Sequence, residues 1–584
     1  MTSPITAVPS SPSFSVAEIP FSHHGSWFDI SPVIAEKTYA DDLHLVSHQT
    51  GLHPVLRLVP TDGDDRVDAT VTATPALLSW VHGTGRVELA YENADTIRVR
   101  GRALGMRIVA ANPTLTPFSG PYFFRDPVDG AYVFTLYETG RRYRITPIAG
   151  PPGAAPGTQE LGSAERGLVF PADREWEVVI EEYETARPPY TPQAPFEEVA
   201  RAAHDRFAAF TDAIAPWRSA ATPAAELAAY VLWSATVRPA GFLARPGVLM
   251  SKHWMDKVWS WDHCFNAIAL GEGAPGLAVD QFQLPFDHQD PAGALPDSVT
   301  HSEILYNFVK PPIHGWALHH LRERLPEDLD RDTLAQLYQR LVAWTDFWLT
   351  ARRAPGQPLP HYQHGNDSGW DNATTFDPER VIQSADLAAF LVLQLRCLAV
   401  LAADLGEDDA TWTAAADRLR GDLIDRLWDG DAFTARGVGT GRTWATSSLL
   451  DLMPIVLGEE LPREVAAVLA GRIKAHLTDY GLATELPSSP HYQPDGYWRG
   501  PIWAPATVLI EDGLRRAGFT ELADDVSARF RALCERSGFA ENFDALTGAG
   551  LRDRAYTWTA SGYLILAAAH ERRRADAPPP TTAP

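Results

Sequence analysis

Two aspartates in a short polar loop are the first residues whose types and spacing could do chemistry. Asp367 and Asp371 lie four residues apart within residues 365–376, among glycine, serine and asparagine residues. These neighbours disfavour a regular helix and let the backbone approach a ligand. Trp370 directly precedes Asp371, and an indole beside a carboxyl group both excludes water and offers a flat apolar face. The segment is a candidate catalytic loop, although an Asx-rich surface turn has the same composition.

Three further loops combine acids with aromatic residues. Residues 252–265 contain three tryptophans and two aspartates, and Asp262 there could either bond a ligand or cap the next helix. Residues 497–503 place Arg499 between aromatic side chains, and residues 540–548 place Glu541 before a turn. Two carboxyl groups and stacking aromatic rings are what hydrolysis of a glycosidic bond requires. The four loops together predict that chemistry more strongly than any one of them.

Composition restricts the class of protein. The chain has 584 residues, 45% of them hydrophobic, and a net charge of -24, which disfavours nucleic acid and anionic membrane surfaces as partners. Three distant cysteines without a CxxC pair support neither a disulfide framework nor a zinc site. Residues 1–21 lack the pattern of a signal peptide, and no window is an uninterrupted apolar run long enough to span a membrane. We expect a cytoplasmic enzyme without a bound metal.

The elements that must position these loops change character near residue 190. Residues 1–20 read as a mobile tail, and residues 25–182 show strand patterns, including alternation over 96–102 and a hairpin over 131–147. A proline-rich linker over 186–195 follows, and helical periodicity then continues to about residue 573. We predict a β-sandwich-like domain over residues 1–190. About twelve helices in residues 191–584 predict an (α/α)6 barrel, although an open solenoid gives the same pattern.

Four motifs resemble those of the trehalases and glycoside hydrolase family 63, including its mannosylglycerate and glucosylglycerate hydrolases. Residues 368–371 (Ser-Gly-Trp-Asp) resemble the family's general-acid segment, and residues 541–544 (Glu-Asn-Phe-Asp) resemble its general-base segment Glu-x-Tyr-Asp. Residues 259–262 are similar to the Tyr-Trp-Asp segment of the sugar pocket, and residues 497–503 match Tyr-Trp-Arg-Gly-Pro-Ile-Trp. The resemblance covers about residues 240–573. It implies an (α/α)6 barrel, an inverting α-glycosidase and no cofactor.

The resemblance also assigns a sugar pocket and has departures. The substrate-binding residues that it implies are Trp259, Trp261, Asp262, Gly369, Trp370, Tyr497, Trp498, Arg499 and Trp503. Residues 371–375 differ from the Asp-Asp-Tyr-Pro-Arg of the processing glucosidases and are closer to the small-substrate hydrolases. The trehalase Pro-Asn-Gly segment appears only as residues 296–298, Pro-Asp-Ser, which argues against trehalose itself. We therefore expect a small α-glucoside, α-mannoside or oligosaccharide as substrate.

Inversion assigns different roles to the two acids. One protonated carboxyl must donate to the leaving oxygen, and an ionised carboxyl roughly 6.5 to 9.5 Å away must activate water. Asp371 fits the acid, because Trp370 would keep its proton in place, and Glu541 fits the base. Asp367 and Glu485 are the competing acid and base, but neither lies in a matching motif.

Two functions of other classes stay open at this point. A glycoside phosphorylase would need cations near Glu541, which Arg552 and Arg554 could supply. A non-catalytic sugar-binding protein would need the tryptophans but not the pair of acids. The oligomeric state is not indicated by the sequence.

Overall fold

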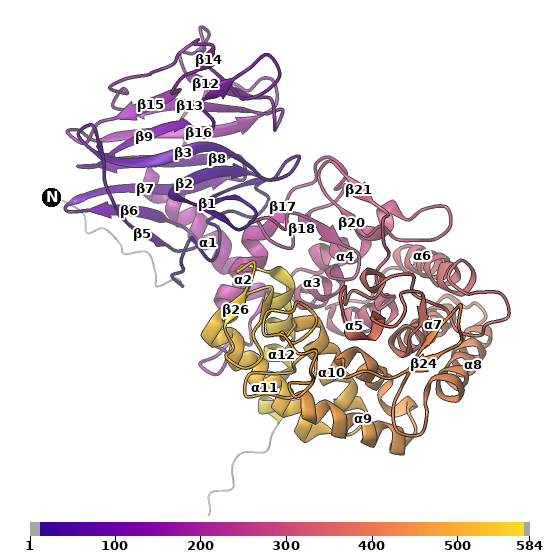
Figure 1. Ribbon diagram of the computed structural model, residues 1–584. Helices are drawn as coiled ribbons and strands as arrows, with labels where there is room; N and C mark the ends of the chain where they lie inside the picture. Colours follow the sequence, from indigo (N-terminus) through magenta and orange to yellow (C-terminus); the bar gives the residue numbers. More distant parts are fainter. Residues whose placement is uncertain (1–11, 577–584) are drawn as a thin grey trace, which may run out of the picture.

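The computed structural model describes residues 12–576, and its first part contains two large antiparallel sheets (Figure 1). The first sheet has the order β1 (Phe28–Ala35), β2 (Thr38–Ser47), β3 (His53–Asp62), β9 (Gly105–Ala110) and β15 (Gly167–Phe170), with β4 (Asp65–Arg66) beside β3. The second has the order β11 (Pro121–Arg125), β12 (Tyr132–Leu136), β13 (Arg142–Ala149), β16 (Trp176–Tyr183), β8 (Thr96–Arg102), β7 (Gly85–Asn93), β6 (Leu78–His82) and β5 (Thr70–Ala73). A small pair joins β10 (Thr114–Leu115) to β14 (Gly162–Ser163).

Alternation along the strands explains how the two sheets pack. In β8, Ile97 and Val99 lie in an apolar core shared by side chains of both sheets, because alternate residues of a strand point to the same face. Arg98 and Arg100 point to the other face, where Arg100 pairs with Glu88 of β7 at 2.8 Å. The strand predicted over residues 96–102 and the hairpin β12–β13 are both confirmed.

The prediction of a mobile tail is wrong for residues 12–20, the part of the tail that the structure describes. Residues 1–11 lie outside the described part, but Phe14 pairs with Ala73, and its ring lies 4.6 Å from that of Tyr230. Ile19 is buried in the core of the helical part. Apolar side chains spaced among the serines and prolines therefore anchor this segment between the strands and the helices.

Helices dominate the chain after residue 196. They are α1 (Phe196–Ile214), α2 (Ala225–Ala235), α3 (His263–Leu270), α4 (Pro275–Gln283), α5 (His314–Arg324), α6 (Arg331–Thr350), α7 (Ala385–Leu405), α8 (Ala410–Leu427), α9 (Arg463–His476), α10 (Ala504–Arg516), α11 (Thr520–Ser537) and α12 (Thr557–Asp576). Four 3-10 segments accompany them: η1 (Pro285–His288), η2 (Gly365–Ser368), η3 (Thr374–Phe376) and η4 (Leu449–Glu460). Residues 449–460 form a 3-10 segment instead of a regular α-helix, because Pro454 lies inside it and Gly458 has a φ of 58°.

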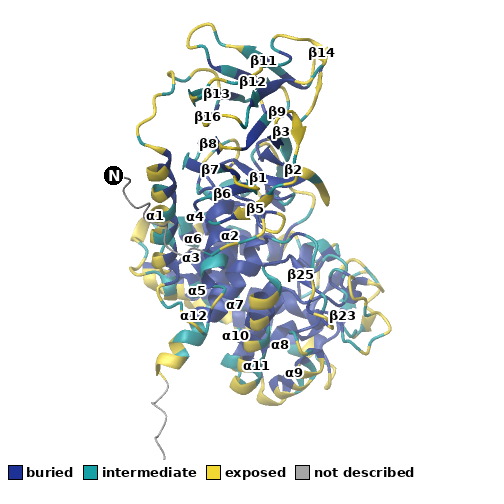
Figure 2. Cartoon of the chain, turned by 90° about the vertical axis from the view of Figure 1, so that its left-hand side faces the viewer, coloured by how far each residue is buried: buried dark blue, intermediate teal, exposed yellow. Residues whose placement is uncertain are grey.

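Six of the helical elements contact one another in a closed cycle. Neighbouring pairs follow the order α3, α5, α7, η4, α10, α12 and back to α3. Outside this cycle, α4 contacts α3, α6 and α8 contact α7, α9 contacts η4, α11 contacts α10 and α12, and α2 contacts α12. Figure 2 shows that the helices at the centre of this part are almost wholly buried.

Helix α7 is long and apolar enough by composition to cross a membrane, but 78% of its apolar window is buried inside the protein. Its place in the cycle of contacts explains that composition, since a helix surrounded on all sides is apolar all round.

Short strands join the loops at one end of the helices. They are β17 (Thr236–Val237) with β18 (Gly247–Val248); β19 (Val258–Trp259), β20 (Ser298–Val299) and β21 (Ile304–Leu305); β22 (Ile382–Gln383), β23 (Ala435–Gly437) and β24 (Thr443–Trp444); and β25 (Asn542–Phe543) with β26 (Gly550–Leu551).

The strand-rich and helical parts meet around a buried lysine. Lys252 donates to Ser22 Oγ at 2.9 Å and to the Ser26 carbonyl at 2.7 Å. Close by, His48 contacts Asp29 at 2.8 Å and Asp256 at 3.6 Å. The predicted linker contains no regular element, and Arg144 of β13 donates to carbonyls within it.

Candidate active site

The small sheet β19–β20–β21 brings the candidate residue Asp262 near a second acid, Asp297. Asp262 follows β19, Asp297 precedes β20, and Ser260 donates its N–H to the Asp297 carbonyl at 3.3 Å. Asp262 occupies the position before α3 but makes no capping hydrogen bond, so the capping interpretation is wrong. Its Oδ2 atom is buried without a hydrogen-bond partner in the described part of the chain. Burial, with the charges of Asp297 and Asp371, raises its pKa to about 8 against the opposing effect of Lys310.

The loop that carries Asp371 is held in one conformation by glycine and by an amide clamp. Gly369 has a φ of 74°, and a Cβ there would lie 2.6 Å from the Trp261 ring, so only glycine fits. Asn372 donates to the Gly496 carbonyl at 3.0 Å and accepts from the Trp498 N–H at 2.9 Å. The loop over residues 365–376 is thereby fixed to the loop over residues 491–503.

Asp371 is a partly buried acid beside a cation. Its Oδ1 atom lies 3.9 Å from Lys310 Nζ and has no hydrogen-bond partner within residues 12–576. Burial raises the pKa of Asp371, the Lys310 charge opposes that rise, and Asp297 adds to it. A carboxyl group of this kind keeps its proton at higher pH than an exposed aspartate.

Backbone hydrogen bonds of Glu541 and of the residues that follow it hold Glu541 in position. Ile502 and Phe543 exchange backbone hydrogen bonds of 2.7 and 3.1 Å, and the Glu541 N–H donates to the Asp553 carbonyl at 2.7 Å. The Glu541 side chain is 1% exposed, and neither carboxyl oxygen has a hydrogen-bond partner among the described residues. Burial, with the charge of Asp553, raises its pKa to about 8, and Arg552 opposes the rise. Both oxygens are free to accept hydrogen bonds from a ligand.

Tyr497 lies close to both acids. Burial, followed by the charges of Asp371 and Glu541, raises the pKa of its phenol well above the ordinary value. Its backbone has a φ of 65°, which is unusual for a residue with a side chain, and the Trp503 indole donates to its carbonyl at 2.8 Å. Asp371 and Glu541, distant in sequence, therefore both act on the same phenol through their charges.

Four of the predicted tryptophans form one buried cluster. The Trp498 ring stacks on Trp503 at 4.1 Å and lies 4.6 Å from Trp370 and 6.5 Å from Trp261. All four side chains are at most 2% exposed, whereas Trp259 is only half-buried. Arg499 binds the Asn372 carbonyl at 2.7 Å and Asp377 at 2.6 Å. In this arrangement the cluster and Arg499 position the loops, and their contact with a sugar remains a prediction.

The two competing acids are fully engaged in the fold. Asp367 accepts from Arg352 at 2.7 Å and from the backbone N–H groups of residues 363 and 309 at 2.8 and 3.2 Å. Glu485 accepts from Thr374 Oγ1 at 2.7 Å and from Ser447. Neither carboxylate has the free oxygens of Asp371 and Glu541, which supports their lower rank.

Lys310 is the main residue of this site that sequence reasoning missed. It is 6% exposed, and Nζ lies 3.1 Å from Asp297 Oδ1 and donates to the Asn366 carbonyl at 3.1 Å. Burial alone would lower the pKa of Lys310, but the charges of Asp371, Asp297 and Asp262 raise it. The sequence could have indicated Lys310 through its position between a valine and two prolines, because an apolar segment rarely holds an unpaired charge.

The cations proposed for a phosphate site have other partners. Arg552 pairs with Asp495 at 2.6 Å and donates to Asn542 at 2.8 Å. Arg554 contacts Glu18 at 3.4 Å and donates to the Gly550 carbonyl at 2.7 Å. Within residues 12–576, no group of three His, Cys, Asp or Glu side chains is arranged to hold a metal ion.

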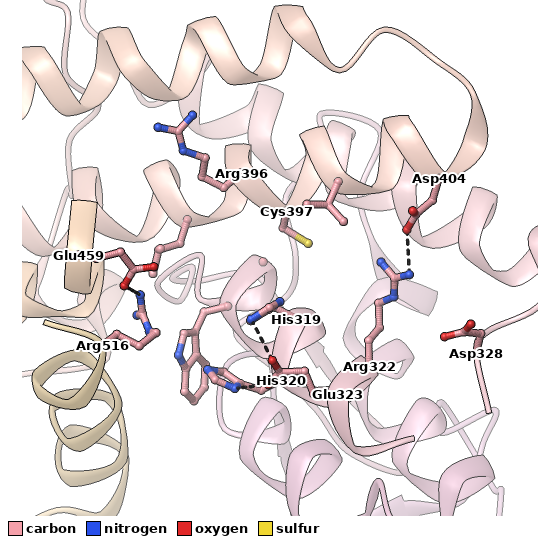
Figure 3. Close-up of a pocket in the computed structure, with 14 residues that line it drawn as sticks. His319, His320, Arg322, Glu323, Asp328, Arg396, Cys397, Asp404, Glu459 and Arg516 are labelled. Atoms are coloured by element: carbon pink, nitrogen blue, oxygen red, sulfur yellow. Dashed lines mark hydrogen bonds and ion pairs between the residues drawn. The ribbon is translucent and has the colours of Figure 1, made fainter. Parts of the chain in front are cut away.

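A separate cavity of about 510 Å³ lies among α5, α7, η4 and α10 (Figure 3). None of the candidate catalytic residues lines it. Most of its charged residues pair with one another or with neighbours, as Arg322 does with Asp404 at 2.8 Å and Arg516 with Glu459 at 3.7 Å. The acids with free oxygens are elsewhere, so this cavity is not the candidate active site.

Comparisons with known proteins agree with a carbohydrate-cleaving site. Residues 255–559, just over half of the chain, match the family described as the mannosylglycerate hydrolase MGH1-like glycoside hydrolase domain. A mannosylglycerate hydrolase of Rubrobacter radiotolerans is 24% identical over 414 residues, covering 55% of this chain and 92% of the relative. A glucosylglycerate hydrolase of Mycolicibacterium hassiacum is 23% identical over 408 residues, covering 53% and 91%.

A solved structure has the same fold over the helical part. The GH63 mannosylglycerate hydrolase of Thermus thermophilus in complex with glucose matches with a TM-score of 0.52 and 24% identity, covering 58% of this chain and 98% of that chain. The protein is thus a glycoside hydrolase. It belongs to the mannosylglycerate hydrolase MGH1-like family, and Asp371 and Glu541 both fall within the matched residues.

Burial of Glu541 predicts a dependence of stability on pH. The unfolded chain loses this proton near the ordinary pKa of 4.5, whereas the folded chain keeps it to about pH 8. The free energy of unfolding therefore falls as pH rises through this window. We expect Glu541→Gln to be more stable than the natural protein at pH 8, by roughly 1 to 4 kcal/mol, with the difference shrinking towards pH 5.

Denaturant unfolding at pH 5, 6.5 and 8 measures this difference. The exposed Glu327→Gln is the control for removing a charge without changing a buried group. A difference between Glu541→Gln and the natural protein that stays constant with pH would show that Glu541 does not carry the pH dependence.

Proposed function

We propose that the protein is an inverting glycoside hydrolase that cleaves an α-glucosidic or α-mannosidic bond of a small glycoside or oligosaccharide. The observation that carries this proposal is a pair of carboxyl groups, the partly buried Asp371 and the buried Glu541, whose charges both act on Tyr497. Asp371 Oδ1 and both oxygens of Glu541 lack a hydrogen-bond partner in the described part of the chain. The names of the relatives, mannosylglycerate and glucosylglycerate hydrolase, favour a small substrate. No metal or organic cofactor has a part in the proposed reaction.

Asp371 acts as the general acid. Its proton passes to the glycosidic oxygen while the bond from that oxygen to the anomeric carbon breaks, and burial raises the pKa of Asp371, which favours the protonated form. Lys310 and Tyr497 lie next to this carboxyl group.

Glu541 acts as the general base. It takes a proton from the water molecule that attacks the anomeric carbon from the opposite face. Hydrogen bonds from a bound water molecule or sugar hydroxyl, together with the Arg552 charge, favour its ionised form over the protonated form that burial alone favours.

The remaining residues bind the substrate and shape the site. Asp262 has a free carboxyl oxygen for a sugar hydroxyl, and Trp259 has a partly exposed ring for stacking. The wall of the site consists of Trp261, Gly369, Trp370, Tyr497, Trp498, Arg499 and Trp503.

The closed cycle of helix contacts supports an (α/α)6 barrel, with six inner elements and six outer helices. The shared core of the two sheets supports a β-sandwich-like domain, with the division between the domains near residue 190. A barrel places the loops after several helices at one end, which is where this proposal locates both Asp371 and Glu541.

Screening the purified protein against small glycosides tests the proposal. The panel consists of mannosylglycerate, glucosylglycerate, trehalose, kojibiose, nigerose and isomaltose, with release of free sugar as the measurement. We expect release of glucose or mannose from at least one of these glycosides without added phosphate. Turnover only in the presence of phosphate would indicate a phosphorylase instead.

A further inference from the structure

Lys310 is a buried cation with a role that the acid and base do not account for. Its ammonium group carries three N–H donors. One donates to the Asn366 carbonyl at 3.1 Å, and Asp297 Oδ1 lies at the same distance. Asp371 Oδ1 is a third neighbouring acceptor, at 3.9 Å.

The strength of the attraction between Lys310 and Asp371 changes during the proposed reaction. While Asp371 is protonated, Lys310 faces a neutral carboxyl group, and the electrostatic attraction between the two groups is weak. Once Asp371 has given its proton to the leaving oxygen, Lys310 faces a carboxylate in a partly buried setting, where opposite charges attract more strongly than in water. The attraction is therefore stronger after proton transfer than before it, which is the condition for an effect on rate.

We propose that Lys310 is a positioning residue that stabilises the carboxylate formed on Asp371 as the leaving oxygen takes its proton. The inference rests on the proposed role of Asp371 as general acid. Lys310 remains an ammonium ion throughout. The proton moves from Asp371 to the glycosidic oxygen, the electrons of the broken bond stay on that oxygen, and Asp371 regains a proton from solvent after product release.

Other charged groups also face Asp371, so their effects must be separated from that of Lys310. They are Asp297 directly before β20, Tyr497 from the opposite loop, His364 directly before η2, and Asp262 next to α3. Removing Lys310 takes away the nearest cation and raises the pKa of Asp371. Removing the charge of Asp297 takes away an anion and lowers it. The two changes should therefore move the high-pH limb of activity in opposite directions.

Leaving groups of different basicity separate this role from a general structural one. An alkyl aglycone, as in glucosylglycerate or mannosylglycerate, needs a proton to leave, whereas fluoride leaves without one. We expect Lys310→Met to lower kcat/KM on the glycerate glycoside by about 10²-fold, and on α-glucosyl or α-mannosyl fluoride by less than about tenfold. Lys310→Arg keeps the positive charge. Its ratio of the rate on the glycerate glycoside to the rate on the fluoride should therefore be closer to that of the natural protein.

The test measures both rates and their pH profiles for Lys310→Met, Lys310→Arg and Asp297→Asn. Lys252→Met is the matched control, because Lys252 is also buried but bonds Ser22 and Ser26 instead of an acid of the site. It should leave the ratio of the two rates unchanged. The high-pH limb should move up in Lys310→Met and down in Asp297→Asn.

Equal losses on both substrates in Lys310→Met would overturn the inference, as would unshifted high-pH limbs in Lys310→Met and Asp297→Asn. If Lys310→Met does not fold, Lys310→Arg and Asp297→Asn decide alone, through the ratio of rates and the direction of the limb. The proposed function fails separately, when the natural protein hydrolyses neither the fluorides nor the glycerate glycosides.

Discussion

Asp371→Asn is expected to lower kcat on a natural small glycoside by about 10²-fold to 10⁴-fold while leaving the fold intact. Asparagine has the shape of the acid but no proton to give, so protonation of the leaving oxygen is lost. Activity on the corresponding α-glycosyl fluoride should fall far less, because fluoride departs without a proton. Steady-state kinetics on the two substrates, with thermal unfolding to check folding, measures the effect.

Asp367→Asn is the matched comparison for this variant. Asp367 bonds Arg352 and two backbone N–H groups, so its replacement should cost stability without separating the two substrates. Near-natural turnover of the glycoside by Asp371→Asn, with loss in Asp367→Asn, would transfer the role of acid to Asp367.

Glu541→Gln should abolish hydrolysis of the glycoside and of the fluoride alike, by about 10³-fold or more. Both substrates need an activated water molecule, and glutamine cannot accept its proton. No glycosyl-enzyme should accumulate, because a single displacement forms no covalent intermediate. Mass spectrometry of the intact protein mixed with the fluoride checks this second expectation.

Glu485→Gln controls for the loss of a buried glutamate. Its carboxylate bonds Thr374 and Ser447, so its replacement should weaken the fold and leave the pattern of substrate rates unchanged. A covalent adduct on Glu541 in the natural protein would mean that it acts as a nucleophile, and the assignment of a base would fail.

Local patterns predicted the elements well where one physical signal dominates. Strand β8 has the bounds that alternation predicts, residues 96–102, and helices follow the linker as apolar periodicity predicts. Element η4 is not a regular α-helix, because Pro454 and Gly458 interrupt it. The prediction of a mobile tail was wrong around Phe14 and Ile19, because the few apolar residues there pack against distant parts of the chain.

The candidate site was predictable as a set of loops but not as a geometry. Asp371 and Glu541 stand in motifs that a sequence displays, whereas their common neighbour Tyr497 becomes evident only in the folded chain. Lys310 was missed for the same reason, since its role depends on the approach of Asp297 and Asp371 from other loops. Long-range contacts of this kind leave no local pattern in the sequence.

The stereochemistry of the first product tests the central proposal most directly. If Glu541 activates a water molecule, a single displacement converts an α-glycoside into the β-sugar, which then equilibrates with its α-anomer. Proton NMR recorded early in the reaction, on whichever glycoside the protein accepts, distinguishes the two anomeric signals. We predict that the β-anomer appears first; initial release of the α-anomer would contradict inversion and the role of Glu541 as general base.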